Sequence, residues 1–322
     1  MKHFIALLGV ILIVLSFASC GKNDNYPYSC DGQVVTKGIY SYYLDAVKKS
    51  PEKYGADKDD TASIKEAVKV CCSEYLGTIK LMEKEGIVLD SEFKRLAAEN
   101  TENIWSLFSE HFESIGVTKQ DITKIQTHES RLLQLLDHYF GADGEKPVSD
   151  DDMKEEFVDM YVGFKAIEGS LTKTNDNGET VELTEKEAEE LESLFRSMAS
   201  KINNRTATID ELNEEYNESL GIIVTAPLST LLMKDGDPMY DDDFFSKVSE
   251  ISHGYAKMIK SGSSIYVIER QTIATDDEDA FMMYRSEVLQ SMKMETVEKK
   301  ITKLIKKMNI AEDEKVIEKL FS

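Results

Sequence analysis

The sequence has 322 residues, of which 38 are Lys or Arg and 60 are Asp or Glu, giving a formal net charge of -22 at pH 7. This excess of acid excludes nucleic acid as a partner, because contacts to phosphate need clustered Lys and Arg. It also argues against adsorption of the folded surface on anionic lipid. We interpret the acidity as a source of solubility and self-repulsion.

The first 20 residues predict an export signal. Met1-Lys2-His3 is a basic start, residues 4–17 are apolar, and Ala18-Ser19-Cys20 is a small-residue cleavage site. The apolar run of about 14 residues is shorter than the roughly 20 needed to span a bilayer as a helix. Residues 17–21 resemble the bacterial lipobox, in which the cysteine receives a diacylglyceryl group and a further acyl chain such as palmitate. An ordinary signal peptide without lipid is the alternative.

The sequence after the cleavage site predicts a tether followed by folded lobes. We expect residues 1–19 to be removed and residues 20–30 to form a lipidated tether on the extracytoplasmic face of a cell membrane. Two acyl chains give stable anchoring, and the polar stretch with Gly and Pro after Cys20 suits a flexible linker. Whether the anchor lies in the inner or the outer membrane of a two-membrane organism stays open. The remaining chain is long enough for two lobes with real cores.

The cysteines and histidines predict no metal site and no cofactor. Cys30, Cys71 and Cys72 remain besides Cys20, and none has the spacing of a metal site. We expect them to be small buried residues. A disulfide from Cys30 to Cys71 or Cys72 stays open. The five histidines are scattered and form no hydrolase or metalloprotease motif.

The stretch 31–161 predicts an all-helical lobe. Tyr40, Tyr43, Leu44 and Val47 recur at steps of three and four residues, as is typical of an amphipathic helix. Gly86 ends a helix of this lobe, and Ser149 begins a later one. The asparagines and aspartate of the turn at 175–178 lack the remaining ligands of a calcium loop.

The stretch 162–273 predicts a small mixed lobe in the order β-α-α-β-α-β. The first helix after the first strand begins near Thr184, and a short helix follows Asp241-Asp242-Asp243. Between them a second helix carries Ile209, Leu212 and Tyr216. The expected strands alternate in polarity or form short apolar runs, and they cover residues 162–171, 228–233 and 264–270.

The stretch 274–322 predicts a C-terminal helix with one apolar face, which needs a partner. We therefore expect an α+β, mostly α, protein in which the mixed lobe is inserted between residues 31–161 and 274–322 of one helical lobe. The chain has 13 methionines, and those of this helix offer adaptable apolar contacts, although Met at helical spacing is more often core. They are Met282, Met283, Met292 and Met294.

This organisation resembles the parvulin-type peptidyl-prolyl isomerases and chaperones of the PrsA and SurA kind. Seven stretches carry the resemblance through loose motifs of the family. They are Asp31–Gly38 with a "NG-x-x-I-T-K" pattern, Tyr75–Glu92 with a helix-turn, Phe164–Ile167 on the first strand, Leu183–Ala188 at the start of the first helix, Thr208–Ser219 on the second helix, Phe244–Ile251 on the short helix, and Ser261–Ile268 on the last strand.

The resemblance implies a chaperone or foldase lobe and an inserted parvulin-like domain. Its partners would be unfolded or nascent secreted polypeptides. The prolyl pocket would be formed by Met239, Phe244, Tyr266 and Ala166, although Met239 and Phe244 are one residue further apart than in the family. The two histidines of the family, which face each other below the pocket, are replaced by Ala166 and Tyr266.

We therefore predict a membrane-anchored foldase with weak or absent isomerase activity. Isomerisation needs little acid or base chemistry, since an apolar pocket that favours the twisted amide lowers a barrier of about 18 to 20 kcal/mol. An active isomerase is the first alternative. The second is a surface lipoprotein that binds one specific partner and has no chaperone role. The oligomeric state is left open.

Overall fold

The computed structural model describes residues 25–274 and 278–321. The predicted signal peptide and Cys20 lie outside these residues. The chain divides into two compact units, one containing the residues up to Gln134 and those from Glu298 onward, the other running from Leu135 to Val297. The second unit is thus an insertion in the first. None of the described helices is both long and apolar enough to cross a membrane.

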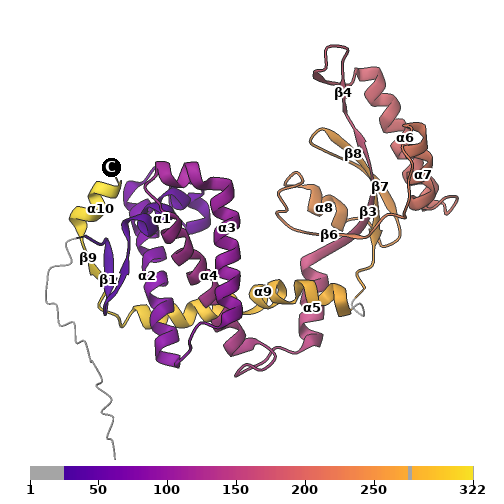
Figure 1. Cartoon of the computed structure of the whole chain (residues 1–322). Coiled ribbons are helices and arrows are strands. Elements are labelled where there is room, and N and C mark those ends of the chain that lie inside the picture. The colour runs from indigo at the N-terminus through magenta and orange to yellow at the C-terminus, as the bar shows by residue number, and fades with distance from the viewer. Residues whose placement is uncertain (1–24, 275–277, 322) are drawn as a thin grey trace, which may run out of the picture. The chain divides into compact units, whose positions relative to one another are not determined.

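The first unit is mainly helical (Figure 1). The division between the units runs through α4 and α9, so each of these helices contributes one end to the first unit. Its elements are β1 (Tyr28–Cys30), β2 (Gln33–Val35), α1 (Lys37–Lys49), the 3-10 helix η1 (Pro51–Tyr54), α2 (Thr61–Glu85), α3 (Ser91–Ser114), α4 (Lys119–Phe140), the end of α9 (Glu278–Ile305), β9 (Ala311–Glu312) and α10 (Glu314–Phe321).

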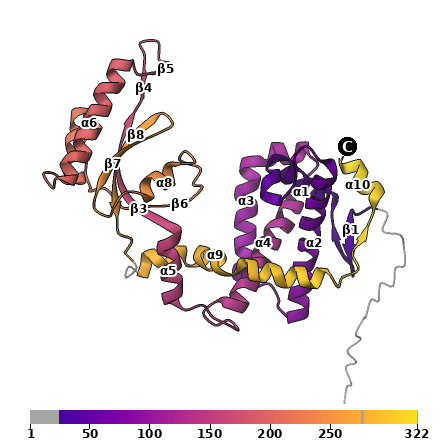
Figure 2. The same ribbon diagram turned by 180° about the vertical axis from the view of Figure 1, so that it is seen from behind.

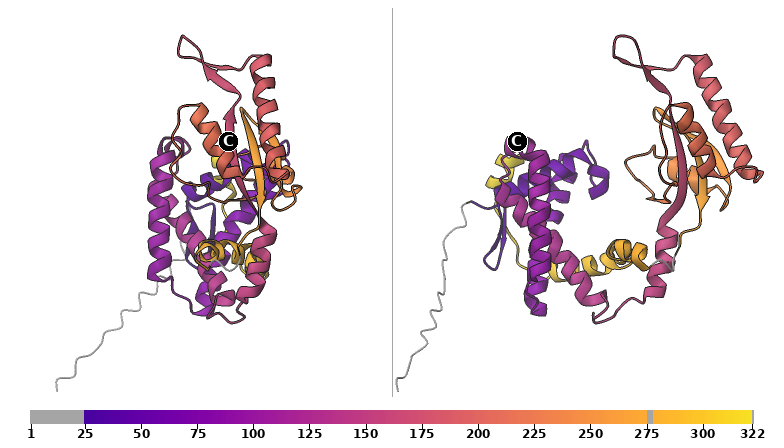
Figure 3. Two further views of the ribbon diagram at one scale, coloured as in Figure 1. Left: turned by 90° about the vertical axis from the view of Figure 1, so that its right-hand side faces the viewer. Right: turned by 45° about the vertical axis from the view of Figure 1, so that its right-hand side comes forward.

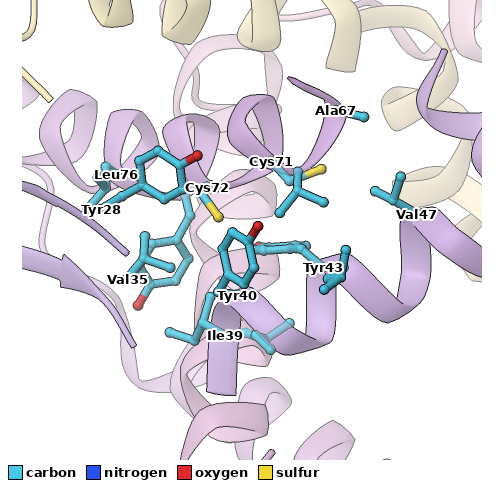
Figure 4. Close-up of a cluster of buried hydrophobic side chains, with 14 of the residues drawn as sticks. Tyr28, Val35, Ile39, Tyr40, Tyr43, Val47, Ala67, Cys71, Cys72 and Leu76 are labelled. Carbon is cyan, nitrogen blue, oxygen red and sulfur yellow. The ribbon is translucent and has the colours of Figure 1, made fainter. Parts of the chain in front are cut away.

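The core of the first unit lies between α1 and α2. Figure 4 shows Tyr40 and Tyr43 of α1 facing Cys71 and Cys72 of α2. Cys30, Cys71 and Cys72 are free and buried, so the disulfide left open by the sequence is not formed. Burial raises the pKa of Cys71 to about 12. These thiols therefore act as small apolar core residues, as predicted.

The segment Thr36-Lys37-Gly38 begins α1 and joins it to α4. Thr36 is the N-cap of α1, and its hydroxyl donates to Asp121 Oδ1 at 2.6 Å. The other carboxylate oxygen of Asp121 accepts from the hydroxyl of Thr118 at 2.6 Å. A Cβ atom on Gly38 would overlap this carboxylate. Glycine is therefore required where α1 passes Asp121.

The C-terminal part of the chain returns to the first unit, where β9 pairs antiparallel with β1 to give the strand order β2-β1-β9 (Figure 2). The sequence predicted one helix over this part. Instead α9 ends at Ile305, and α10 follows β9 as a separate helix with Ile317 in the core. The short strand was missed because a two-residue strand has no measurable periodicity.

The second unit contains an antiparallel sheet in the order β6-β3-β8-β7. A hairpin, β4 with β5, extends from the end of β3. The elements are α5 (Asp150–Met160), β3 (Tyr161–Ser170), β4 (Thr172–Thr174), β5 (Thr180–Glu182), α6 (Glu185–Asn203), α7 (Ile209–Ser219), β6 (Leu231–Lys234), α8 (Phe244–Ser249), β7 (Ala256–Ser261) and β8 (Ser264–Gln271).

Helices cover both faces of this sheet, with α6 and α7 on one side and α8 on the other (Figures 1 and 3). Ile167 and Val267 point toward α6 and α7, where Phe195 is fully buried. Phe164 and Ile268 point toward α8. The alternation along β3 and β8 therefore separates two small cores.

The predicted mixed lobe is present, but its sheet has one strand more than expected, and the hairpin of β4 and β5 was not predicted either. The strand β7 was not predicted, because its buried residues Ala256, Ile259 and Ser261 do not alternate regularly. It forms a hairpin with β8 around Gly262, which has a positive φ of 54°. The described chain is mostly helical with this small sheet inserted, so the predicted fold class is confirmed. The predicted boundaries of the mixed lobe, at residues 162 and 273, stay a prediction.

Candidate functional site

The α8 side of the sheet carries an aromatic cluster. Phe164 of β3 and Tyr266 of β8 lie on this face, and the register pairs Ala166 with Ile268 and Glu168 with Tyr266. The ring of Phe164 is fully buried, whereas Ala166 and Tyr266 are partly exposed. The first residue of α8 therefore packs on this face of the two central strands.

Phe244, the first residue of α8, is the centre of the cluster. Its side chain is 0% exposed, and its ring lies 5.5 Å from that of Tyr266 in an edge-to-face arrangement. Tyr240 stacks on it with 4.2 Å between ring centroids and 9° between planes. Tyr240 thus covers Phe244, and a bound ligand would meet Tyr240 and Tyr266 before it could reach Phe244.

Three of the four predicted pocket residues lie together, namely Phe244, Tyr266 and Ala166. Met239 is 81% exposed and lies outside this buried cluster. Tyr240 was not predicted as a pocket residue. It stands four residues before Phe244, which is the spacing found in the family, whereas Met239 stands one residue further away. Counting back four residues from Phe244 would have found it. Whether these side chains bind a prolyl peptide stays a prediction.

Glu168 is the residue that faces Tyr266, and not Ala166 as the sequence suggested. Its carboxylate oxygen Oε1 accepts hydrogen bonds from the Tyr266 hydroxyl at 3.1 Å and from the Ser264 hydroxyl at 2.7 Å. The strand pairing, and not the sequence order, decides which residues lie opposite each other. A carboxylate and a phenol therefore face each other across β3 and β8.

The hydroxyl groups of this cluster stay protonated at neutral pH. Burial raises the pKa of Tyr266 above that of a free phenol, and the charge of Glu168 adds to the rise. Burial also raises the pKa of Tyr240, to which Asp237 and Glu168 contribute. The cluster consequently offers apolar ring faces and neutral hydrogen-bond donors.

A cavity of about 320 Å³ opens next to the cluster, in the loop between β6 and α8. Met233, Pro238, Tyr240 and Phe245 supply its apolar wall, and Tyr240 belongs both to this wall and to the aromatic cluster. The carboxylates that line it are those of Asp237, Asp241 and Asp242.

Hydrogen bonds to the backbone fix this loop. Asp237 Oδ1 accepts from the Met239 amide at 3.0 Å, and Asp241 Oδ2 accepts from the Gly262 amide at 2.9 Å. Two of the acidic side chains are therefore held in place by the fold. Among the residues that the structure describes, no group of three or more His, Cys, Asp or Glu is arranged to hold a metal ion.

Comparison of the fold with solved structures found several similar chains. The chain is similar to the foldase PrsA of Streptococcus pneumoniae, with 14% identity and a TM-score of 0.40 over 91% of this chain and 97% of that one. It is also similar to PrsA of Lactococcus lactis, with 12% identity and a TM-score of 0.36 over 92% and 98% of the two chains.

A SurA-like chaperone structure of Campylobacter jejuni is similar over 90% of this chain and 99% of its own, with 12% identity and a TM-score of 0.30. No protein-family profile and no curated protein matches the sequence. Each of these similarities covers 90% or more of this chain.

Proposed function

We propose that this protein is an extracytoplasmic foldase or chaperone, anchored by lipid on Cys20, that holds unfolded segments of secreted polypeptides and has weak or absent prolyl isomerase activity. The observation that carries this proposal is the exposure of large apolar side chains on both units. Folded monomers rarely expose apolar side chains in groups, and such groups mark sites of interaction.

In the first unit the exposed side chains lie on α3. Leu107 is 73% exposed and Phe108 is 53% exposed, although Trp105 and Phe112 of the same helix pack toward the core. The helix is therefore well anchored on its inner face. Leu107 and Phe108 are presented outward by a rigid element, as a surface that receives varied apolar segments requires.

In the second unit the exposed side chains lie on a loop and on α9. Ile223 is 85% exposed and Met283 is 79% exposed, next to the exposed Met282. Met side chains adapt to varied partners, because they are unbranched and polarizable. These methionines are therefore available for contact with clients, whereas Met292 and Met294 are partly buried.

The aromatic cluster supports the proposal of weak or absent isomerase activity. An isomerase lowers the barrier by holding the twisted amide and the prolyl ring in an apolar pocket. Here the ring that would form this pocket, Phe244, is covered by Tyr240 and fully buried. We infer that a prolyl ring reaches Phe244 only if Tyr240 swings away, which makes binding costly.

The test combines two assays on the mature protein. One follows the aggregation of a denatured, proline-rich secreted protein, and the other follows the isomerisation of a proline-containing peptide. We expect suppression of aggregation at about equimolar ratio with little isomerisation, and we expect Leu107→Ser with Phe108→Ser to weaken suppression at least about twofold. Glu110→Ser, an exposed change on the same helix, is the control.

Three other outcomes would change the assignment. Isomerisation that is lost on Phe244→Ala would make the protein an active isomerase. Isomerisation that increases on Tyr240→Ala would show that Tyr240 closes a working pocket. The absence of both activities would leave a lipoprotein that binds one specific partner.

A further inference from the structure

We propose that the cavity between β6 and α8 is a subsite for a cationic side chain, Lys or Arg, of a bound polypeptide. This inference rests on the proposed function, since it assigns a preference to the polypeptide that the protein holds. Of the acidic residues that line the cavity, Asp241 and Asp242 were predicted only as part of a helix start, and the proposed holding of clients uses none of them.

The cavity combines two kinds of surface. Its wall is apolar, with Met233 almost fully buried and Tyr240 and Phe245 partly exposed toward it. Its volume of about 320 Å³ exceeds that of a single side chain. A long aliphatic stem fits such a wall, because Lys and Arg bury their methylene groups on apolar surface while the charged head stays near solvent.

The charge of the lining selects the head group. Asp237, Asp241 and Asp242 line the cavity, and the one basic residue in its lining, Lys234, forms an ion pair with Glu287 of α9. The described lining therefore has an excess of negative charge. A guanidinium or ammonium group is attracted to it, and a carboxylate is repelled.

The position of the cavity connects it to the aromatic cluster. Tyr240 forms part of the cavity wall and also stacks on Phe244, so a residue seated in the cavity lies beside the exposed edge of the cluster. A polypeptide that places a basic residue next to an apolar or prolyl residue satisfies both surfaces. The net charge of -22 would favour the approach of such a chain.

The experiment uses the mature protein and a series of fluorescent peptides that share a Phe-Pro sequence and differ in the preceding residue, which is Lys, Arg, norleucine or Glu. Anisotropy at low salt gives the Kd of each. We expect Lys and Arg to bind about threefold to fivefold more tightly than norleucine, as for a partly exposed ion pair, and Glu to bind more weakly than norleucine. The preference should shrink at about 0.5 M salt.

Two variants with the same net charge distinguish an effect of the cavity from an effect of the overall charge of the protein. Asp242→Asn removes a carboxylate of the lining and should reduce the ratio of Lys to norleucine affinity by about half. Asp243→Asn is the control, because Asp243 is adjacent in sequence and exposed but pairs with Lys247 and does not line the cavity. Thermal unfolding checks that both variants are folded.

Each remaining outcome contradicts the inference in a distinct way. Equal binding of the Lys, norleucine and Glu peptides would overturn the subsite and leave the proposed function standing. An equal loss of preference in both variants would show that net charge, and not the cavity, selects the peptide. Failure of every peptide to bind, norleucine included, would overturn the proposed function and the subsite together.

Discussion

His128 of α4 is a buried titratable residue that belongs to none of the predicted sites. Its side chain is 5% exposed, and its ring centroid lies 5.3 Å from that of Tyr75. The Nδ1 atom is buried without a hydrogen-bond partner. Burial, reinforced by the charge of Arg131, lowers the pKa of His128 to about 3. The folded protein therefore holds this imidazole neutral at pH values where the unfolded chain would protonate it.

This produces a pH dependence of stability with a defined sign. Because the pKa of His128 is lower in the folded state, the unfolded state binds the extra proton below about pH 6.5, and stability falls as the pH decreases toward 3. Between pH 7 and 5.5 the loss is about 1 kcal/mol. His128→Gln does not titrate and should lose about 1 kcal/mol less over the same interval.

Trp105, the single tryptophan of the chain, is the reporter, because it packs on the core of the first unit. Urea unfolding followed by its fluorescence gives the free energy of unfolding at both pH values. Burial raises the pKa values of Glu74 and Glu129, so these residues add stability as the pH falls. They do so equally in the original protein and in His128→Gln, and their contribution therefore cancels when the two are compared. An unchanged pH dependence in the variant would contradict the role of His128.

At the scale of elements, Gly77 sets the distance between α2 and the end of α9. A Cβ atom at this position would lie 2.6 Å from Ile305 Cγ1 and 2.9 Å from Ile301 Cγ2. Real Cβ atoms do not approach so closely, so the absence of a side chain lets the two helices pack. This contact joins the C-terminal chain to the N-terminal helices within the first unit.

We expect Gly77→Val to destabilise the first unit by about 1 to 3 kcal/mol, because the added side chain overpacks this contact. Ile305→Ala removes the nearest atom. The double variant should therefore lose less stability than the sum of the losses in the two single variants. Urea unfolding followed by Trp105 measures all three variants. Strict additivity would show that Gly77 does not limit the approach of the two helices.

Local signals predicted most elements, since their causes lie within a few residues. Thr184 and Thr208 begin α6 and α7 with complete capping boxes, and Gly86 ends α2 with a positive φ of 69°. The strand β7 and the pairing of Glu168 with Tyr266 could not be found in this way. Both depend on which strand lies alongside, and that contact is not encoded by local periodicity.

At the scale of the whole molecule, the proposed attachment to the membrane rests on one residue outside the described structure. We expect Cys20→Ser to move the protein from the membrane fraction to the aqueous fraction, because lipid on the thiol is the proposed anchor. Phase separation with detergent measures the distribution. Cys30→Ser is the control, since Cys30 is a buried core thiol. Retention of the Cys20 variant on the membrane would contradict the lipid anchor.

The sequence by itself determined the helical character of the first unit and the inserted position of the small sheet, because both follow from periodicity and from local start and stop signals. The export signal stays a prediction, and the family is a resemblance carried by short motifs. The tertiary structure alone decided that Tyr240 covers Phe244, that Glu168 and not Ala166 faces Tyr266, and that three aspartates line one apolar cavity. Such features depend on strand register and loop packing, which bring together residues far apart in the chain.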